Sequence, residues 1–213
     1  RQVYASTDPD FIPEDVPVAM ADISDLKMTI VTNDPTKRYY YTLLFDDKYR
    51  VKIATRNINI PGVQNFRDLG GYPSYSTKKQ MRWGMIYRSA EIDSLECSSR
   101  RELKNLGIRT LIDLRASSEI GRQSPLQKGF NVVHIPLATG DMEGILKGIR
   151  EEKIKSDTVY RMVERMNRIL IDQYTKEYRQ IFDILLDKNS YPVVIHCCLL
   201  YTSPSPRDKR QSR

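Results

Sequence analysis

The sequence predicts an α/β domain that follows a segment of antiparallel β-structure. Three observations support this prediction. Residues 1–58 contain strand-like runs and turns but no helical periodicity, whereas from residue 59 apolar strand-like runs alternate with helical ones. A polar His-Cys pair closes the last of these runs, as expected where parallel strands end at a site. The 213 residues suffice for one large domain, or for a medium domain and part of a second.

Residues 1–58 are interpreted as part of a β-sandwich. Strands are expected at 28–32, 39–45 and 49–54, and the Asp46-Asp47 pair predicts a hairpin between the last two. The segment resembles the second half of a fibronectin type III or immunoglobulin-like module, whose first strands would lie upstream of Arg1. The alternative is a β extension of the following domain.

Residues 59–197 contain the predicted α/β elements. Ser99 and Glu102 form a capping-box pattern that opens a short helix, and Gly107 ends it. Buried strands are expected at 108–114 and 132–136.

The next two elements lead to the end of the predicted domain. Residues 156–186 have apolar spacing typical of one long or two consecutive helices. Pro192 then introduces a short buried strand at 193–195, which ends in His196 and Cys197.

Composition excludes several classes of protein. The net charge is +7, but the basic residues are scattered among acidic ones without a nucleic-acid motif, so no nucleic-acid partner is expected. No apolar run approaches the roughly 18 residues of a membrane span. Three cysteines, two of them adjacent, predict no disulfide framework, and two distant histidines predict no metal site. No cofactor is expected.

Cys197 is the residue whose position suggests chemistry. A strand end holds a sulfur rigidly, and a following loop can direct backbone N–H groups at it, which favours a thiolate and the binding of a phosphoryl group. The alternative is an ordinary buried cysteine, which is common. The position of Cys197 alone does not decide between a reactive cysteine and a structural one.

Several motifs, in order along the chain, resemble a bacterial branch of the tyrosine and dual-specificity protein phosphatases. The segments are NFRDLGG at 65–71, YRSAE at 87–91, LGI at 106–108, IDLR at 112–115, EYR at 177–179 and VIHC at 194–197. The resemblance covers about two-thirds of the chain and implies a central sheet flanked by helices. It also implies hydrolysis of phosphomonoesters through a phosphocysteine.

The resemblance assigns roles to residues. Cys197 would be the nucleophile, and His196 would help to lower the pKa of the thiol. Asp141 is the candidate general acid, with Glu143 close by. Asp113 is an alternative acid, although pairing with Arg115 or with a neighbouring loop is the favoured interpretation.

Three further residues lie in the matching motifs. Arg67 and Asp68 are expected to form a structural ion pair or to brace the site, and Arg88 is a further candidate for substrate binding or bracing. Gly70 and Gly71 are expected to form a tight turn with positive φ.

The chain departs from the family directly after Cys197. The family pattern HC-x5-R requires arginine where this chain has Ser203, and the glycines of the catalytic loop are also missing. A bidentate phosphate ligand would be lost, so the chain is expected to be inactive. The string CLLYTSPSPRD at 198–208 resembles a translated sequencing adapter, so residues 198–213 are interpreted as non-native and the domain as truncated. The alternative is a genuine degenerate phosphatase.

The sequence is compatible with two functions. The first is a phosphatase acting on phosphotyrosine proteins or small phosphomonoesters, with phosphoserine, phosphothreonine or phosphoinositides as further candidate substrates. The second is a non-catalytic phosphate-binding or scaffolding module. A rhodanese-like sulfurtransferase also places cysteine at a strand end, but the NFRDLGG motif argues against it. The compartment is left open, with export to the cell envelope suggested by the β module.

Overall fold

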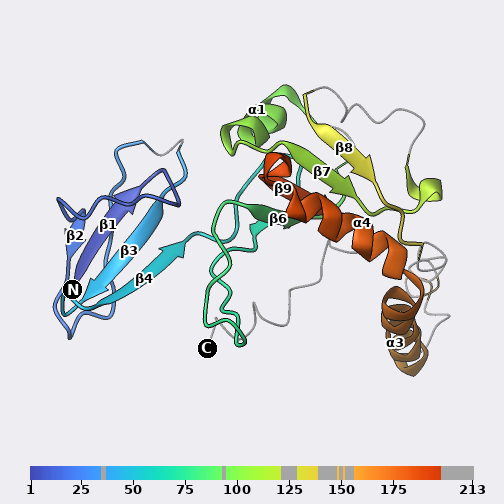
Figure 1. The fold of residues 1–213 in the computed structure, drawn as a ribbon, viewed down its shortest axis with the longest axis horizontal. Helices are drawn as coiled ribbons and strands as arrows, with labels where there is room; N and C mark the ends of the chain where they lie inside the picture. Colours follow the sequence, from blue (N-terminus) through green and yellow to red (C-terminus); the bar gives the residue numbers. More distant parts are fainter. Residues whose placement is uncertain are drawn as a thin grey trace.

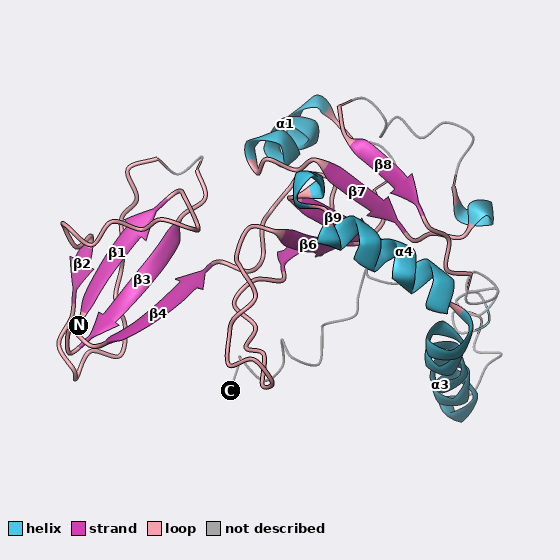
Figure 2. Ribbon diagram, in the orientation of Figure 1, coloured by secondary structure: helices cyan, strands magenta, loops and turns pink. Residues whose placement is uncertain are grey.

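The computed structural model describes residues 1–34, 37–92, 95–120, 129–138, 148, 151 and 156–197. These residues form two sheets, an N-terminal one and a larger one with helices packed against it (Figures 1 and 2). The first sheet is antiparallel, in the order β2-β1-β3-β4. Its strands are β1 (Gln2–Ser6), β2 (Ala19–Met20), β3 (Tyr40–Phe45) and β4 (Tyr49–Ala54).

The second sheet has the order β5-β6-β9-β7-β8. The strand β5 is antiparallel to β6, whereas β6, β9, β7 and β8 are parallel to one another. The strands are β5 (Arg67–Asp68), β6 (Ile86–Ser89), β7 (Thr110–Asp113), β8 (Asn131–His134) and β9 (Val193–His196). The helices are α1 (Cys97–Asn105), α3 (Ser156–Gln173) and α4 (Thr175–Leu186), with 3-10 turns at Ser117–Glu119 and Lys188–Ser190. This mixed sheet flanked by helices is the predicted fold class.

The N-terminal sheet confirms the predicted hairpin but not the first predicted strand. Asp46 and Asp47 both adopt positive φ, of 51° and 53°, between β3 and β4. Residues 28–32 form no strand. Val31 is 84% exposed. β-Branched composition alone therefore does not make a strand, because strand propensity depends on packing and burial.

The predicted α/β elements are present with small shifts in their bounds. The predicted strands at 108–114 and 132–136 appear as β7 and β8, and the strand at 193–195 appears as β9. The helical stretch is two helices, and the break lies at Tyr174.

Helix α1 begins earlier than predicted, and the capping-box prediction was wrong. Its N-cap is Glu96, which makes no side-chain capping bond. The Ser99 hydroxyl instead donates to the carbonyl of Pro61 at 2.5 Å, which ties the helix to the chain before β5. The predicted stop is confirmed, since Gly107 has φ of 73° and its N–H donates to the carbonyl of Lys104.

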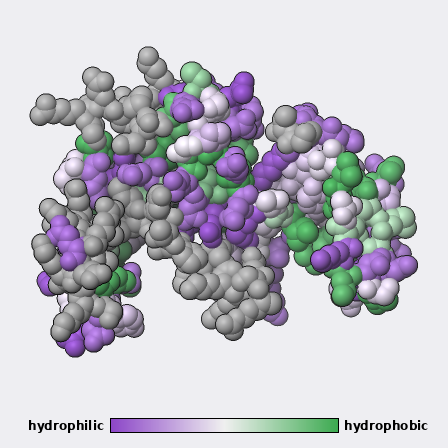
Figure 3. All heavy atoms as spheres, turned by 180° about the vertical axis from the view of Figure 1, so that it is seen from behind, coloured by the Kyte–Doolittle hydropathy of each residue, from purple (hydrophilic) through white to green (hydrophobic). Residues whose placement is uncertain are grey.

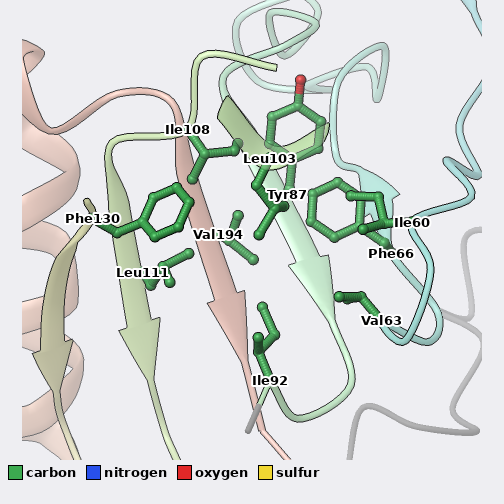
Figure 4. Close-up of a cluster of buried hydrophobic side chains, with 10 residues drawn as sticks. All are labelled: Ile60, Val63, Phe66, Tyr87, Ile92, Leu103, Ile108, Leu111, Phe130 and Val194. Atoms are coloured by element: carbon green, nitrogen blue, oxygen red, sulfur yellow. The ribbon is translucent and has the colours of Figure 1, made fainter. Parts of the chain in front are cut away.

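Side chains alternate between the two faces of the larger sheet, and each face has its own apolar cluster. Leu111 and Val194 face the side of α1, where they pack with Leu103. Figure 4 shows this cluster, which comprises Ile60, Val63, Phe66, Tyr87, Ile92, Leu103, Ile108, Leu111, Phe130 and Val194. The next residues along the strands, Ile112 and Val193, face α4. The sheet is therefore covered on both faces, as a parallel sheet requires.

A buried ion pair connects the two sheets. Arg38, which precedes β3, donates to the carboxylate of Asp68 in β5 at 2.7 Å, and the side chains are 12% and 0% exposed. The same guanidinium donates to the hydroxyl of Tyr87 at 3.0 Å. A cavity of about 940 Å³ lies beside this junction, between the N-terminal sheet and Met85 and Pro192, which precede β6 and β9.

Apolar side chains remain on the surface of the N-terminal sheet. Figure 3 shows hydrophobic residues gathered on this part of the molecule. Tyr49, Val51 and Ile53 alternate along β4 and are 69%, 41% and 40% exposed, so they share one face of the sheet. Within the described ranges, no helix has both the length and the apolar character that a bilayer crossing would need.

Candidate active site

Cys197 directly follows β9, at the carboxyl end of the central strand of the larger sheet. The parallel neighbours β6 and β7 flank β9, so the ends of three strands meet around this residue. Cys197 is a free cysteine of intermediate exposure. The described part of the site therefore presents a half-buried cysteine that directly follows the central strand.

His196, the last residue of β9, is fully buried. Its Nδ1 atom accepts a hydrogen bond from the backbone N–H of Ile92 at 3.4 Å, and lies 3.9 Å from Oδ1 of Asp113. Its carbonyl accepts from the backbone N–H of Leu114 at 3.0 Å. The residue before the cysteine is thus fixed by both its backbone and its ring.

Asp113 and Arg115 form a buried bidentate pair beside His196. Nε of Arg115 donates to both carboxylate oxygens of Asp113, at 3.0 and 3.1 Å, and a terminal guanidinium nitrogen donates to Oδ2 at 2.8 Å. The two side chains are 4% and 0% exposed. Arg115 was one of the two partners predicted for Asp113 from the sequence, the other being a neighbouring loop, and the structure shows the pair with Arg115.

The pair determines the charge state of Asp113. Burial alone would raise the pKa of Asp113, but the hydrogen bonds from Arg115 and the charge of His196 outweigh it, so this pKa lies below its ordinary 3.8. Asp113 is therefore a carboxylate at neutral pH. A group in this state accepts protons poorly and has none to give, so it does not suit the role of general acid.

This pKa shift predicts how stability changes in acid. A carboxyl whose pKa is lowered by folding stabilises the folded state above the pKa of the unfolded chain, and that stability is lost as pH falls through the folded value. We expect the free energy of unfolding to drop as pH is lowered below about 4. Urea unfolding at pH 5, 4 and 3 measures the drop, which should be smaller in Asp113→Asn. Equal slopes for the two proteins would contradict the prediction.

Arg67 and Arg88 lie side by side across β5 and β6. They are direct cross-strand partners, and Arg88 also neighbours Ile195 in β9. Ile195 packs on the α4 face, so both arginines stand on that face of the sheet and His196 on the other. Their proximity to the end of β9 fits the predicted bracing or substrate-binding role, which stays a prediction.

Asp68 has a different neighbour from the one expected. The predicted pair with Arg67 is wrong, because the carboxylate pairs with Arg38 and also accepts from the backbone N–H groups of Gly70 and Gly84, at 2.7 and 2.8 Å. Asp68 therefore braces the junction between the sheets. The sequence carried no signal for Arg38, which lies thirty positions upstream outside every matching motif.

The two glycines of the NFRDLGG motif pack against one tryptophan. A Cβ atom at Gly70 or Gly71 would overlap Trp83, and Gly71 also has φ of 75°. The guanidinium of Arg56 lies over the Trp83 ring, 5.0 Å from its centroid. The predicted positive φ is thus confirmed at Gly71 but not at Gly70, where close packing against Trp83 accounts for the glycine instead.

Two further predictions from the sequence concern the general acid and the metal site. Asp141 and Glu143 lie outside the described residues, so the identity of the general acid stays a prediction. Among the residues that the structure describes, no three His, Cys, Asp or Glu side chains are grouped to hold a metal ion.

Comparisons with known proteins give two findings. The sequence profile of the tyrosine phosphatase family matches residues 58–199, which is more than half of the chain. The triple specificity protein phosphatase PtpB of Mycobacterium tuberculosis is 38% identical over 79 residues. That match covers 36% of this chain and 27% of the mycobacterial protein, so the chain spans about a quarter of that relative's length.

Proposed function

Because this chain belongs to the tyrosine phosphatase family, we propose that its protein hydrolyses phosphomonoesters with Cys197 as the nucleophile. The observation that carries the proposal is the place of Cys197, half-buried at the carboxyl end of the central parallel strand. Phosphotyrosine in proteins is the proposed substrate. Because the mycobacterial relative is called a triple specificity protein phosphatase, substrates other than phosphotyrosine should be tested as well, namely phosphoserine, phosphothreonine and phosphoinositides.

The proposed reaction has two steps. The Cys197 thiolate attacks phosphorus and forms a phosphocysteine, while the bond to the ester oxygen breaks and that oxygen takes a proton from a general acid. Water then attacks the phosphocysteine, which releases inorganic phosphate and restores the thiolate. Asp141 remains the proposed acid, and the pairing of Asp113 with Arg115 supports this choice by removing the alternative.

The chain as printed is proposed to lack turnover. Ser203 stands where the family pattern has its phosphate-binding arginine. A serine hydroxyl cannot replace two parallel charge-assisted hydrogen bonds to phosphate oxygens. The loss of even one such transition-state donor costs about 10²–10³ in rate, and here several are replaced.

The test compares p-nitrophenyl phosphate hydrolysis by two proteins. The 213-residue chain should give no rate above buffer, whereas the protein read from its own gene through a complete Cys-x5-Arg loop should turn over. In the latter, Cys197→Ser should reduce kcat by about 10³-fold or more. Cys97→Ser is the matched control, because Cys97 is exposed on α1, and it should leave the rate unchanged. Equal rates for the Cys197→Ser variant and its parent would refute the nucleophile.

A non-catalytic phosphate-binding or scaffolding module is the second candidate. The observation that favours it is again Ser203, if this residue is encoded by the natural gene. The source DNA decides between the two: codons matching the adapter sequence for residues 198–208 would support the enzyme, and any other codons would support the module.

A further inference from the structure

One face of the N-terminal sheet consists entirely of alanine, branched aliphatic and aromatic side chains. In the antiparallel register, Leu43 of β3 is the direct partner of Val3 in β1 and of Val51 in β4, and direct partners share a face. Residues two positions apart along each strand stand on this face as well. We call this set the apolar face, and its members are Val3, Ala5, Ala19, Tyr41, Leu43, Phe45, Tyr49, Val51 and Ile53.

The opposite face of the sheet is mixed in composition, yet it is the face that the chain covers. The segment between β1 and β2 crosses it, because Glu14 pairs with Arg50 at 2.8 Å and Lys52 donates to the carbonyl of Pro9. The buried residues on this covered face include Tyr40, Thr42 and Leu44. Along β4, by contrast, the members of the apolar face are 40% to 69% exposed.

An exposed apolar face of this kind is typical of an interaction surface. Antiparallel sheets normally turn their polar face to water and their apolar face to a core, and a large exposed apolar patch marks a contact site. Figure 3 shows the hydrophobic residues gathered on this part of the molecule. The two apolar clusters found among the described residues both belong to the larger sheet, so neither covers the apolar face.

The distribution of charge favours a second copy of this chain as the cover. A net charge of +7 opposes self-association in general. Residues 1–58, however, contain eight Lys/Arg and nine Asp/Glu, whereas residues 59–213 contain 26 and 18. Contact through the N-terminal sheets therefore brings nearly neutral surfaces together and keeps the basic parts of the two chains apart. Because no charged side chain belongs to the apolar face, the contact buries no charge without a partner.

The rim of the apolar face carries charges of both signs at its hairpin end. The guanidinium of Arg1 lies 5.5 Å from the centroid of the Phe45 ring. Asp46 and Asp47, in the adjoining turn, are exposed. In a two-fold pair each patch meets a copy of itself, so a rim with both signs can be complementary to itself. An uncharged centre with a polar rim is the usual anatomy of a protein interface.

We propose that two copies of this chain associate through their apolar faces, which pack on each other as the two sheets of a β-sandwich. Three strands of six residues give a face of about 20 Å by about 14 Å, or about 300 Å² on each copy. A standard interface buries about 800 Å² per partner, so the dimer is reversible, with a Kd of about 10–100 µM. The proposal is independent of the role of Cys197, which follows a strand of the other sheet.

The edge of β4 offers a different contact, which the sequence disfavours. β4 is the last strand in the order of its sheet. Two β4 strands paired about Val51 would set Arg50 of each copy opposite Lys52 of the other, and like charges directly opposite are destabilising. Lys52→Gln removes that repulsion and keeps a donor for the carbonyl of Pro9. It should tighten an edge-to-edge dimer and leave the Kd of a face-to-face dimer unchanged.

Sedimentation equilibrium of the 213-residue chain tests the proposal at concentrations from about 1 to about 200 µM. Reducing conditions exclude disulfide-linked dimers. We expect a monomer–dimer equilibrium that Val51→Lys weakens at least about tenfold, because two lysines would then meet inside the interface without a counter-ion. Leu186→Lys is the matched control, since Leu186 is an aliphatic residue that is 80% exposed on α4, and it should leave the Kd unchanged.

Several results would overturn the proposal. A chain that stays monomeric at about 200 µM would leave the apolar face to a different partner. A dimer that persists in Val51→Lys, or that Leu186→Lys weakens equally, would use another surface, and tighter association of Lys52→Gln would indicate the edge. Far-ultraviolet circular dichroism checks the fold of each variant. If Val51→Lys does not fold, Tyr49→Lys gives the same test, because Tyr49 is 69% exposed.

Discussion

Replacing Asp68 with alanine should lower the free energy of unfolding by about 3–5 kcal/mol, since breaking a buried ion pair leaves a charge without its partner. The orphaned charge would be Arg38, whose side chain is 12% exposed. The substitution also removes the acceptor for the buried N–H groups of Gly70 and Gly84. Urea unfolding at pH 7 gives the difference directly, and a loss below about 1 kcal/mol would show that the junction is not buried in solution.

The matched control is the pair of Asp10 and Arg82, which also connects the two parts of the chain. Its side chains are 54% and 61% exposed, so it is also a carboxylate–guanidinium pair, but one that is exposed to solvent. Asp10→Ala should cost no more than about 1 kcal/mol, because side-chain entropy and solvent screening offset most of its attraction. If both alanine variants lost the same stability, burial would not be the cause of the Asp68 effect.

Gly71→Ala should destabilise the protein by about 3–5 kcal/mol, because overpacking and an unfavourable backbone conformation act together. The new Cβ would overlap the ring of Trp83, and φ is 75°. The ring cannot easily move aside, since Trp83 is 7% exposed and Arg56 lies over it. The measurement is again urea unfolding, with the near-ultraviolet circular dichroism of the tryptophan as a second reading of its displacement.

Gly62 provides the control that separates these two causes. It has φ of 71° but nothing within 4 Å of an added Cβ, so Gly62→Ala tests the backbone strain alone. We expect a loss of about 1–2 kcal/mol for this variant. A loss at Gly71 no larger than at Gly62 would mean that Trp83 gives way, and the packing argument for the second glycine of the NFRDLGG motif would fail.

Elements whose signals are local were predicted well from the sequence. The spacing of apolar residues and the flanking turns indicated β7, β9 and the helices α3 and α4, because those patterns are set by burial on one or two faces. The strand predicted at 28–32 does not form, since strand formation depends on tertiary packing that a β-branched composition does not specify. The short strands β1 and β2 were missed, and β1 gains its ladder from β3, about forty residues away.

In the candidate site, too, features that depend on residues close in sequence could be predicted, whereas contacts between distant segments could not. The place of His196 and Cys197 at a strand end, and the pairing of Asp113 with Arg115, are short-range features that could be predicted. The partner of Asp68 could not, because Arg38 meets it only after two separate sheets have packed together. The capping prediction at Ser99 failed in the same way, since the hydroxyl found the carbonyl of Pro61.

The ion pair between Arg38 and Asp68 limits where the protein can be shortened. In sequence, the change from β-structure to alternating strands and helices near residue 59 looks like a natural place to cut. A shortened chain that starts there would keep the fully buried carboxylate of Asp68 and discard its counter-ion. Anyone seeking the phosphatase domain alone must therefore retain the segment carrying Arg38, or supply a new positive charge to that carboxylate by design.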